Sequence, residues 1–207
     1  MIARRGICFL LAAPSGAGKS TIAQALLTQD PKLALSISVT TRAPRPNERE
    51  GQHYFFRDDA AFAEMVRRGE LLEHATVFGR SYGTPRAPVM AALAAGRDVL
   101  FDIDWQGCRQ LRNALPGDVV GVFVLPPSLT TLRARMRGRA GENEAEIEQR
   151  MAAARAEISH WPEFDHVIVN DDFEVALRGV RAILHAARLA TSRQTGLAAF
   201  VASLDQG

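Results

Sequence analysis

One short segment near the start of the chain limits the fold more than any other feature. Its residues, Ala13-Pro14-Ser15-Gly16-Ala17-Gly18-Lys19-Ser20, follow an apolar run at 7–12 and precede a helical pattern at 21–28. In a phosphate-binding loop between a strand and a helix, glycines let backbone N–H groups turn toward phosphate oxygens, and the helix N-terminus adds the positive end of its dipole. The lysine of such a loop reaches the β- and γ-phosphates, and the following hydroxyl binds Mg²⁺. We therefore predict a P-loop with Lys19 and Ser20 in these roles, although Ala13 stands where the usual pattern begins with Gly.

The alternative interpretation of this segment is a Gly-rich turn with an incidental lysine. The patterns on either side disfavour it, because a P-loop requires a strand before it and a helix after it. Apolar runs recur at 99–103, 119–125 and 167–169, with further helical patterns at 87–95 and 147–160. Continuous apolar runs are typical of strands buried on both faces, and their alternation with helices is typical of a parallel sheet. The sequence thus predicts an α/β fold, a three-layer core of the P-loop NTPase type.

Length, charge and cysteine content narrow the class of protein. At 207 residues the chain suits one α/β domain with inserted segments, so we expect a single domain over 1–207. A formal net charge of +2 gives no reason to expect nucleic acid as a partner, and no stretch approaches the roughly 20 apolar residues that span a membrane. The two cysteines, Cys8 and Cys108, form no metal-type pair, which favours a reducing cytoplasm.

Two segments interrupt the alternation of strands and helices. The first begins with a stretch at 35–56 that is rich in Ser, Thr, Arg, Pro and Gly, and we expect an inserted subdomain over 36–95. The second, 133–155, concentrates arginines and glutamates around Gly138 and Gly141, and we expect a mobile lid there. The core then comprises 1–35, 96–132 and 156–207.

The inserted segment places Arg42 and Arg45 close together, stiffened by Pro44 and Pro46 and followed by Tyr54. Two guanidinium groups near a phenol can hold a phosphate monoester through charge-assisted hydrogen bonds. From composition alone, a solvated basic loop is an equally good interpretation.

These motifs together resemble those of a known family. The P-loop, the arginine-rich segment and Asp102-Ile103-Asp104-Trp105-Gln106-Gly107 occur in the order and spacing of the guanylate kinases, and the likeness covers nearly the whole chain. The resemblance implies a phosphotransferase that moves the γ-phosphoryl group of ATP to GMP with Mg²⁺, giving ADP and GDP. It implies that ATP contacts Ala13, Pro14, Ser15, Gly16, Ala17, Gly18, Lys19, Ser20, Thr21 and Asn170.

The same resemblance implies the residues of the GMP site. The phosphate of GMP would be held by Arg42, Arg45, Tyr54 and Tyr82, and its base would be read or oriented by Ser38, Glu73, Thr84 and Asp104. Base chemistry supports Glu73, because guanine presents two parallel donors to a carboxylate whereas adenine presents an acceptor at N1. Sites that demand a hydrogen bond reject analogues lacking it by about 10⁴ or more. Without the family, a surface carboxylate is the more natural interpretation of Glu73.

The remaining predicted groups are the metal ligands and the lid arginines. Asp102 ends an apolar strand, where ligands collect in open α/β sheets, and would orient Mg²⁺ or its waters beside Ser20. An apolar stripe of Ile147, Met151, Ala154 and Ile158 directs Arg150, on its edge, toward the body of the protein. The family's lid arginines fall on Arg135, Arg139 and Arg150, whereas Arg133, Arg137 and Arg155 are expected at the surface. The predicted catalytic residues are Lys19, Arg42, Arg135, Arg139 and Arg150.

Two alternatives to this function stay open at the level of sequence. One is a small-molecule kinase resembling ribose 1,5-bisphosphate phosphokinase, which has no need of base-reading residues such as Glu73. The other is a non-catalytic guanylate-kinase-like binding module, although such modules usually lose the P-loop lysine or the lid arginines. The tail at 184–207 either covers the core or meets a second copy of the chain, so a homo-oligomer is retained as an alternative to a monomer.

Overall fold

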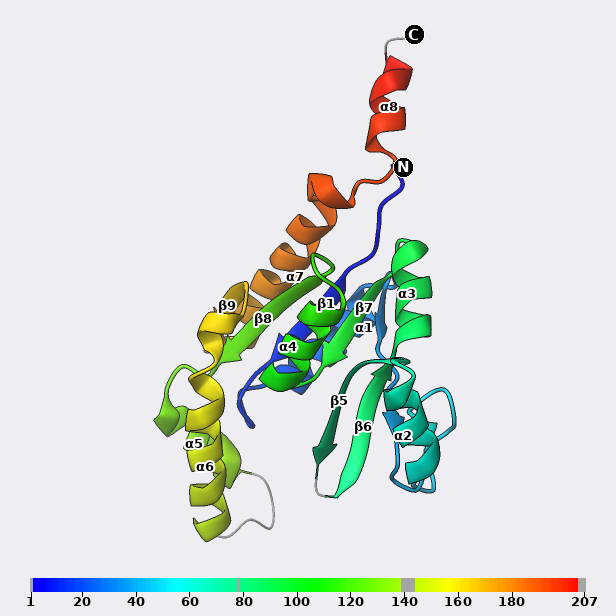
Figure 1. The fold of residues 1–207 in the computed structure, drawn as a ribbon. Helices are drawn as coiled ribbons and strands as arrows, with labels where there is room; N and C mark the ends of the chain where they lie inside the picture. Colours follow the sequence, from blue (N-terminus) through cyan, green and yellow to red (C-terminus); the bar gives the residue numbers. More distant parts are fainter. Residues whose placement is uncertain (1, 78, 139–143, 205–207) are drawn as a thin grey trace.

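The computed structural model describes residues 2–77, 79–138 and 144–204 of the chain. Its centre is a five-stranded parallel sheet in the order β2-β7-β1-β8-β9 (Figure 1). The strands are β1 (Cys8–Ala12), β2 (Leu33–Leu35), β7 (Asp98–Asp102), β8 (Val119–Leu125) and β9 (His166–Val169). The four apolar runs correspond to β1, β7, β8 and β9, and the predicted α/β fold with a parallel core sheet is confirmed.

Helices cover both faces of this sheet, and the alternation of side chains along β1 shows how. Ile7, Phe9 and Leu11 face one side, where they pack with α1 (Lys19–Gln29) and α7 (Phe173–Leu189). Cys8, Leu10 and Ala12 face the other side, where they pack with α3 (Arg86–Ala94) and α4 (Trp105–Ala114). Successive side chains of a strand point to opposite faces, so a continuous apolar strand requires a helical layer on each side. Cys8 and Cys108 are both buried as free thiols in the α3–α4 layer.

A second, smaller sheet lies below the α3 end of the core (Figure 1). It has the order β4-β3-β6-β5 and comprises β3 (Val39–Thr40), β4 (Phe55–Phe56), β5 (Leu71–Val77) and β6 (Arg80–Pro85). Helix α2 (Asp59–Arg67), capped by the Asp58 carboxylate at Ala61 N, packs Phe62 against Val39 and Leu71. The segment 36–95 thus supplies this sheet, and through α3 it also supplies part of the core.

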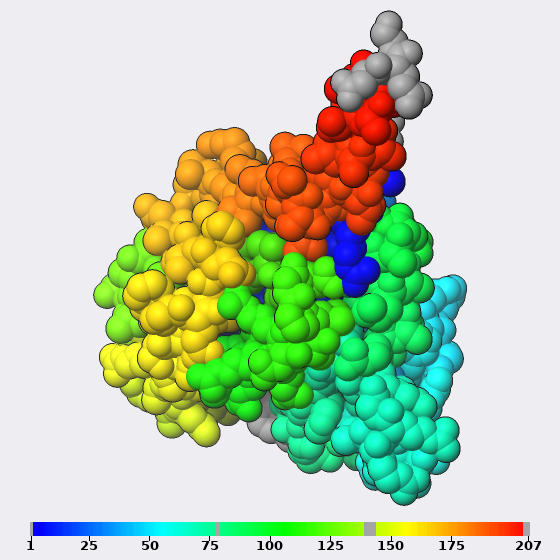
Figure 2. Space-filling model, turned by 45° about the horizontal axis from the view of Figure 1, so that its top comes forward, coloured from blue at the N-terminus to red at the C-terminus, as the bar shows by residue number. Residues whose placement is uncertain are grey.

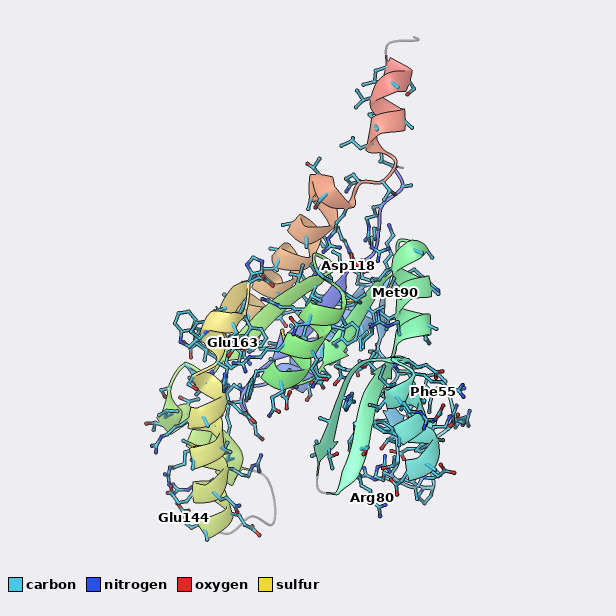
Figure 3. All side chains as sticks on the ribbon, viewed as in Figure 1. Phe55, Arg80, Met90, Asp118, Glu144 and Glu163 are labelled. Atoms are coloured by element: carbon cyan, nitrogen blue, oxygen red, sulfur yellow. The ribbon has the colours of Figure 1, made fainter. Side chains whose placement is uncertain are left out.

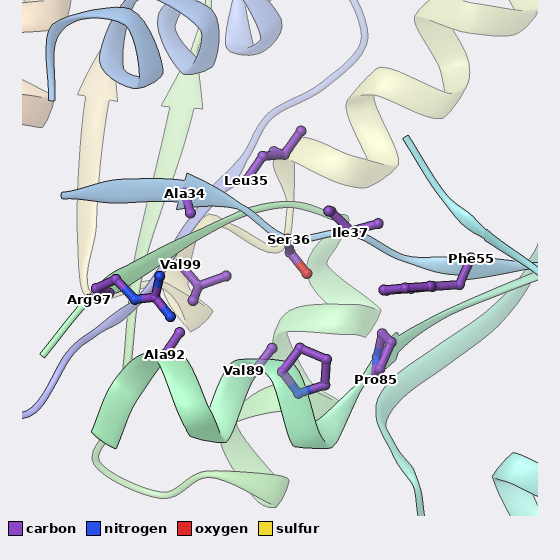
Figure 4. A pocket seen from close by; sticks show the side chains of 11 residues that line it. Ala34, Leu35, Ser36, Ile37, Phe55, Pro85, Val89, Ala92, Arg97 and Val99 are labelled. Carbon is purple, nitrogen blue, oxygen red and sulfur yellow. The ribbon is translucent and has the colours of Figure 1, made fainter. Parts of the chain in front are cut away.

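An apolar cavity of about 150 Å³ lies where the two sheets join (Figure 4). It is bounded by the linker that follows β2, by Phe55 of β4 and by Val89 and Ala92 of α3. Ser36, in that linker, has a buried hydroxyl without a hydrogen-bond partner among the described residues. The junction between the two sheets therefore contains unfilled apolar space and a buried hydroxyl without a partner among the described residues.

The arginine-rich segment forms a helical pair. Helices α5 (Leu129–Arg137) and α6 (Glu144–Ile158) pack through a small cluster of Leu132, Met136, Ile147, Met151 and Ala154. Three of the four predicted stripe residues are therefore buried in this contact, and Ile158 is half-buried. Figure 3 labels Glu144 at the start of α6, where it pairs with Arg133 and Arg137. Figure 1 shows this pair and the β5–β6 hairpin extending from the same end of the core.

The chain ends in a helix that stands away from the body. After α7 come a short 3₁₀ turn, η2 (Thr191–Arg193), and α8 (Leu197–Leu204). Figure 2 shows α8 projecting from the surface, and its Phe200, Val201 and Leu204 are exposed. Among the described residues, no helix combines the length and the apolar character needed to cross a bilayer.

Candidate active site

The P-loop connects β1 to α1 as predicted, and two of its glycines adopt left-handed backbone conformations. Gly16 has φ +91° and Gly18 has φ +96°, a region that residues with a Cβ rarely adopt. Asn170, directly after β9, donates from Nδ2 to the Ala17 carbonyl at 2.7 Å. A Cβ on Gly18 would lie 2.3 Å from that Nδ2 atom. The loop is thereby fastened to the end of a strand two positions away in the sheet.

Lys19 pairs with Asp102, which ends the neighbouring strand β7. Ser20 follows Lys19 in the first turn of α1, so the chain offers a hydroxyl next to the lysine in sequence and a carboxylate in contact with it. Mg²⁺ prefers hard oxygen ligands and is usually held by one or two carboxylates together with substrate phosphates. Within the described ranges, no group of three His, Cys, Asp or Glu side chains gathers in the manner of a resident metal site. The donor set therefore fits Mg²⁺ that arrives with a nucleotide.

Two of the arginines predicted for the lid reach the P-loop region. Arg150 on α6 donates from Nη2 to Ser15 Oγ at 2.6 Å, and Arg135 on α5 donates from Nη2 to the Asn170 carbonyl at 3.0 Å. The Nη1 atom of Arg135 is buried and has no acceptor among the described residues, which is unusual for a guanidinium. Arg135 also lines a cavity of about 360 Å³ beside Gly16, Gly18, Thr21 and Asn170. Arg139 lies outside the described residues.

Glu157 is a second α6 residue at the P-loop, after Arg150, and sequence reasoning missed it. Its carboxylate accepts a hydrogen bond from the backbone N–H of Ser15. Burial raises the pKa of Glu157, and the nearby charge of Asp104 acts in the same direction. Helical spacing from Arg150 was the available signal, because residues seven apart lie on one face of a helix.

The predicted phosphate-binding residues of the small sheet also converge. The Arg42 guanidinium lies 5.4 Å from the centre of the Tyr54 ring, and that ring meets Tyr82 edge-on at 6.2 Å. Arg42 donates to Glu48 Oε1 at 2.8 Å, and the backbone N–H of Arg45 donates to Glu48 Oε2 at 2.8 Å. Arg42 and this N–H together lower the pKa of Glu48 to about 2. Glu48 was not predicted. The Arg45 side chain is exposed, and its charge also contributes to the lowered pKa of Glu48.

Glu73 is buried, so its interpretation as a surface carboxylate is wrong. It is 6% exposed, and Oε1 accepts a hydrogen bond from the fully buried hydroxyl of Thr84 at 2.7 Å. The pairing of β5 with β6 shifts by one residue between Leu71 and His74. Such a bulge breaks the alternation of side chains, and Leu71, Leu72 and Glu73 are buried in succession. Burial raises the pKa of Glu73.

Asp104 lies near Glu73 and caps α4, accepting from Gly107 N at 2.9 Å. Its negative charge contributes to the raised pKa of Glu73 as well as to that of Glu157, so it lies between the small sheet and the lid. Ser38, directly before β3, holds β4 through its carbonyl, which accepts from Phe55 N at 2.8 Å. The predicted residues thus gather into a group at the P-loop, a cationic and phenolic group at Arg42, and an acidic group at Glu73.

Comparisons with known proteins agree with this arrangement. The family model described as guanylate kinase matches residues 5–187. A guanylate kinase of Gluconobacter oxydans is 60% identical over 98% of this chain and 98% of its own length, and that of Rhodospirillum rubrum is 54% identical over 97% and 92%. A crystal structure of guanylate kinase from Anaplasma phagocytophilum has a TM-score of 0.76, with 36% identity over 98% of this chain and 96% of that one. The chain belongs to the guanylate kinase family, the phosphotransferases that move a phosphoryl group from ATP to GMP.

Proposed function

We propose that ATP and GMP bind on opposite sides of Asp104 and that the γ-phosphoryl group passes between them in line. The donor side comprises the P-loop, Thr21 and Asn170, and its support is the cavity that joins these elements with Arg135. Lys19 exchanges its contact with Asp102 for the phosphates of ATP. Arg135 and Arg150 neutralise charge on the transferring group, and Arg139, outside the described residues, is assigned to them by resemblance alone.

The acceptor side is proposed on the small sheet. Arg42, Tyr54 and Tyr82 would hold the phosphate of GMP with help from Arg45, and Ser38, Glu73, Thr84 and Asp104 would read its base. The observation that carries this proposal is the buried Glu73 carboxylate with Thr84 as its partner. A buried carboxylate is costly unless a ligand supplies donors, and guanine supplies two parallel ones. A sugar bisphosphate has hydroxyl groups but no such pair of parallel N–H donors.

Mg²⁺ would be held by Ser20 and, directly or through water, by Asp102. When bound, it shields the negative charge of the ATP phosphates. The chain's own contribution is the hydroxyl of Ser20, which follows Lys19 in α1, and the carboxylate of Asp102, which pairs with Lys19.

The reaction requires no covalent intermediate, because a phosphate oxygen of GMP is already an anionic nucleophile. Phosphoryl transfer depends mainly on positioning and charge stabilisation, and arginines of this kind contribute a factor of roughly 10³–10⁵ in rate. Arg42 would align the acceptor while Lys19, Arg135 and Arg150 stabilise the charge on the donor side. Closure of the small sheet within the segment 36–95, and of the segment 133–155, around the core at 1–35, 96–132 and 156–207 would exclude water, which otherwise competes as the acceptor. Helix α3 would stay packed on the core sheet.

We also propose a cytoplasmic location, supported by two cysteines that are buried as free thiols. A homo-oligomer is a further proposal, for which the exposed apolar residues of α8 provide support.

An ADP-release assay with ATP and Mg²⁺ tests the reaction and its acceptor together. GMP, AMP, UMP and ribose 1,5-bisphosphate are offered in parallel to the native chain and to the Lys19→Ala and Glu73→Gln variants. We expect rapid release with GMP alone, abolished by Lys19→Ala and selectively weakened by Glu73→Gln. Release only with the sugar bisphosphate would contradict the base-reading site, and no release with any acceptor would contradict the kinase.

A further inference from the structure

Gln110 on α4 binds the backbone of β5 through both ends of its side-chain amide. The N–H of His74 donates to Gln110 Oε1 at 3.0 Å, and Gln110 Nε2 donates to the His74 carbonyl at 3.0 Å. His74 directly follows Glu73. The peptide beyond the buried carboxylate is therefore held by a matched donor and acceptor from a helix of the core.

The place of β5 in its sheet gives these bonds their importance. β5 is an edge strand, so only one of its sides pairs with a neighbouring strand, β6. The ladder to β6 is also interrupted by the bulge between Leu71 and His74. A bulge at an edge re-aims a side chain but leaves backbone groups without partners. Gln110 supplies partners to the open edge at the residue where the bulge ends.

The same helix carries Asp104 at its N-cap, six residues before Gln110. A rigid α-helix fixes the separation of two such positions at about 9 Å along its axis. α4 thereby sets the distance between Asp104 and the strand that presents Glu73. The imidazole of His74 is directed elsewhere, meeting Phe62 edge-on at 6.5 Å, so His74 enters this arrangement through its backbone.

We propose that Gln110 is a positioning residue for recognition of the guanine base. Its amide holds the Glu73 segment in register with Asp104, so that both carboxylates face one ring. The inference rests on the proposed role of Glu73 and assigns no contact between Gln110 and GMP. Its prediction is specific: loss of the amide weakens GMP use and base selectivity while leaving ATP use unchanged.

The first test uses Gln110→Met, which preserves the length of the side chain but removes the donor and the acceptor. We expect the KM for GMP to rise about tenfold, as two net hydrogen bonds of ordinary strength allow, with kcat and the KM for ATP changed less than twofold. The ratio of kcat/KM for GMP to that for AMP should fall in parallel. Asn113→Met places the same side chain at an exposed position of the same helix and is the matched control. Equal effects of the two substitutions would overturn the inference.

A pH series with Gln110→Glu separates positioning from a general effect on folding. An ionised glutamate accepts from His74 N but repels the His74 carbonyl, whereas a protonated carboxyl reproduces the donor and the acceptor of the amide. We expect GMP affinity, measured relative to the native chain at each pH, to recover as pH falls toward 5. A constant ratio across the series would count against the proposal.

Combination with Glu73→Gln separates the positioning role of Gln110 from the base-reading role of Glu73. If Gln110 acts through Glu73, the double variant Gln110→Met/Glu73→Gln loses little more GMP selectivity than Glu73→Gln alone. Additive losses would overturn the positioning role and leave the proposed function intact. A Glu73→Gln variant with native selectivity would instead reject Glu73 as base reader, and the role of Gln110 with it.

Discussion

The carboxyl of Glu73 is nearly enclosed by protein. We expect its neutral form to favour stability of the fold and its ionised form to favour binding of GMP. Burial and the charge of Asp104 raise its pKa above the ordinary value of about 4.3. Between the ordinary and the raised value, the folded chain binds more protons than the unfolded chain. The stability that the neutral carboxyl contributes is therefore complete at low pH and is lost as pH rises through the raised pKa. The contact with guanine proposed for Glu73 requires the ionised form, so we expect GMP binding to have the opposite pH dependence.

Glu73→Gln should consequently separate stability from function. Gln keeps an acceptor for Thr84 and removes a buried charge, and we expect the free energy of unfolding at pH 7 to rise by about 1 kcal/mol. The same change should lower kcat/KM for GMP by about 10²-fold, because an amide opposes one donor of guanine with another donor. Thermal unfolding without ligand and steady-state kinetics with GMP and AMP measure the two effects. A variant less stable than the native chain would contradict the cost assigned to this charge.

Gly18 allows a prediction at the donor side. In Gly18→Ala the new Cβ would meet Asn170 at 2.3 Å in a backbone region that disfavours it. We expect a loss of about 1–3 kcal/mol in the free energy of unfolding and at least a tenfold rise in the KM for ATP, with GMP affinity unchanged in calorimetry. Gly69→Ala is the control, because Gly69 has φ +65° and open space around the position of a Cβ. The Gly69→Ala variant should lose stability but keep its KM for ATP. A similar rise in the KM for ATP in this control would show that backbone strain, and not the contact with Asn170, causes the effect of Gly18→Ala.

Sequence reasoning found the residues that lie within motifs and missed those that act across segments. The P-loop, Arg42 and Tyr54 were predicted because their chemistry is local. Glu157 and Gln110 act on backbone groups brought near by tertiary packing. Spacing along α6 could have placed Glu157 on the face of Arg150, but no spacing in the sequence indicates the contact of Gln110 with β5. For Glu73 the local pattern alone favoured a surface position, and only the resemblance assigned it to the GMP site. Its burial follows from a bulge, which no periodicity reveals and which puts three consecutive side chains of β5 in the interior.

At the scale of elements, the end of α6 is joined to the start of α4. Trp105 stacks on His160 with 3.6 Å between ring centroids, and Arg109 lies 4.5 Å from the Trp105 ring. Glu163, labelled in Figure 3, accepts from Arg109 and contacts His160 Nδ1 at 2.7 Å. Arg109, followed by His160, lowers the pKa of Glu163 to about 2. This joint, composed of Trp105, Arg109, His160 and Glu163, ties the lid helix to the residue next to Asp104.

Substitution of His160 should show what the joint contributes. We expect His160→Ala to lower the free energy of unfolding by about 1 kcal/mol through loss of stacking, and to lower kcat several-fold because the lid arginines are less firmly placed. His160→Phe retains a stacking ring and should recover most of both. Denaturant unfolding and single-turnover kinetics provide the two measurements. If Phe is as damaging as Ala, the contact with Glu163 and not the ring holds the joint.

The helices and strands were predictable where their burial produces a run or a period of apolar residues in the sequence. β1, β7, β8 and β9 appeared as apolar runs, whereas β2, at the edge of the sheet with only Leu33 buried, did not. β3 and β4 are two residues long, too short for any period to show. The helix at 87–95 was predicted, but its packing against the core sheet depends on contacts with β7 that the sequence does not display.

For the whole molecule, the lid and the small sheet differ in how closely they meet the P-loop. α6 already contacts Ser15 through Arg150 and Glu157. The small sheet instead joins the core beside the apolar cavity of Figure 4. We therefore expect the small sheet to make the larger movement when substrates bind.

Small-angle scattering can test this order of closure. The radius of gyration should decrease with GMP, change little with a non-hydrolysable ATP analogue, and be smallest with both. The Arg42→Gln variant should require far more GMP for the same decrease. An unchanged radius with both ligands would contradict closure, and a decrease with the ATP analogue alone would assign the movement to the lid.

The two buried thiols have a further consequence for how the molecule can be observed. Burial raises the pKa of Cys8 to about 12 and also raises that of Cys108. Since the thiolate is the reactive species, both groups should be inert toward alkylating reagents in the closed native state. Alkylation then requires that the chain opens. When opening and closing are faster than the reaction, the alkylation rate is set by the population of open forms. Alkylation of Cys8, in the central strand, would report global unfolding, and alkylation of Cys108 would report the release of α4. The rates of both events could therefore be followed without introducing a label into the chain.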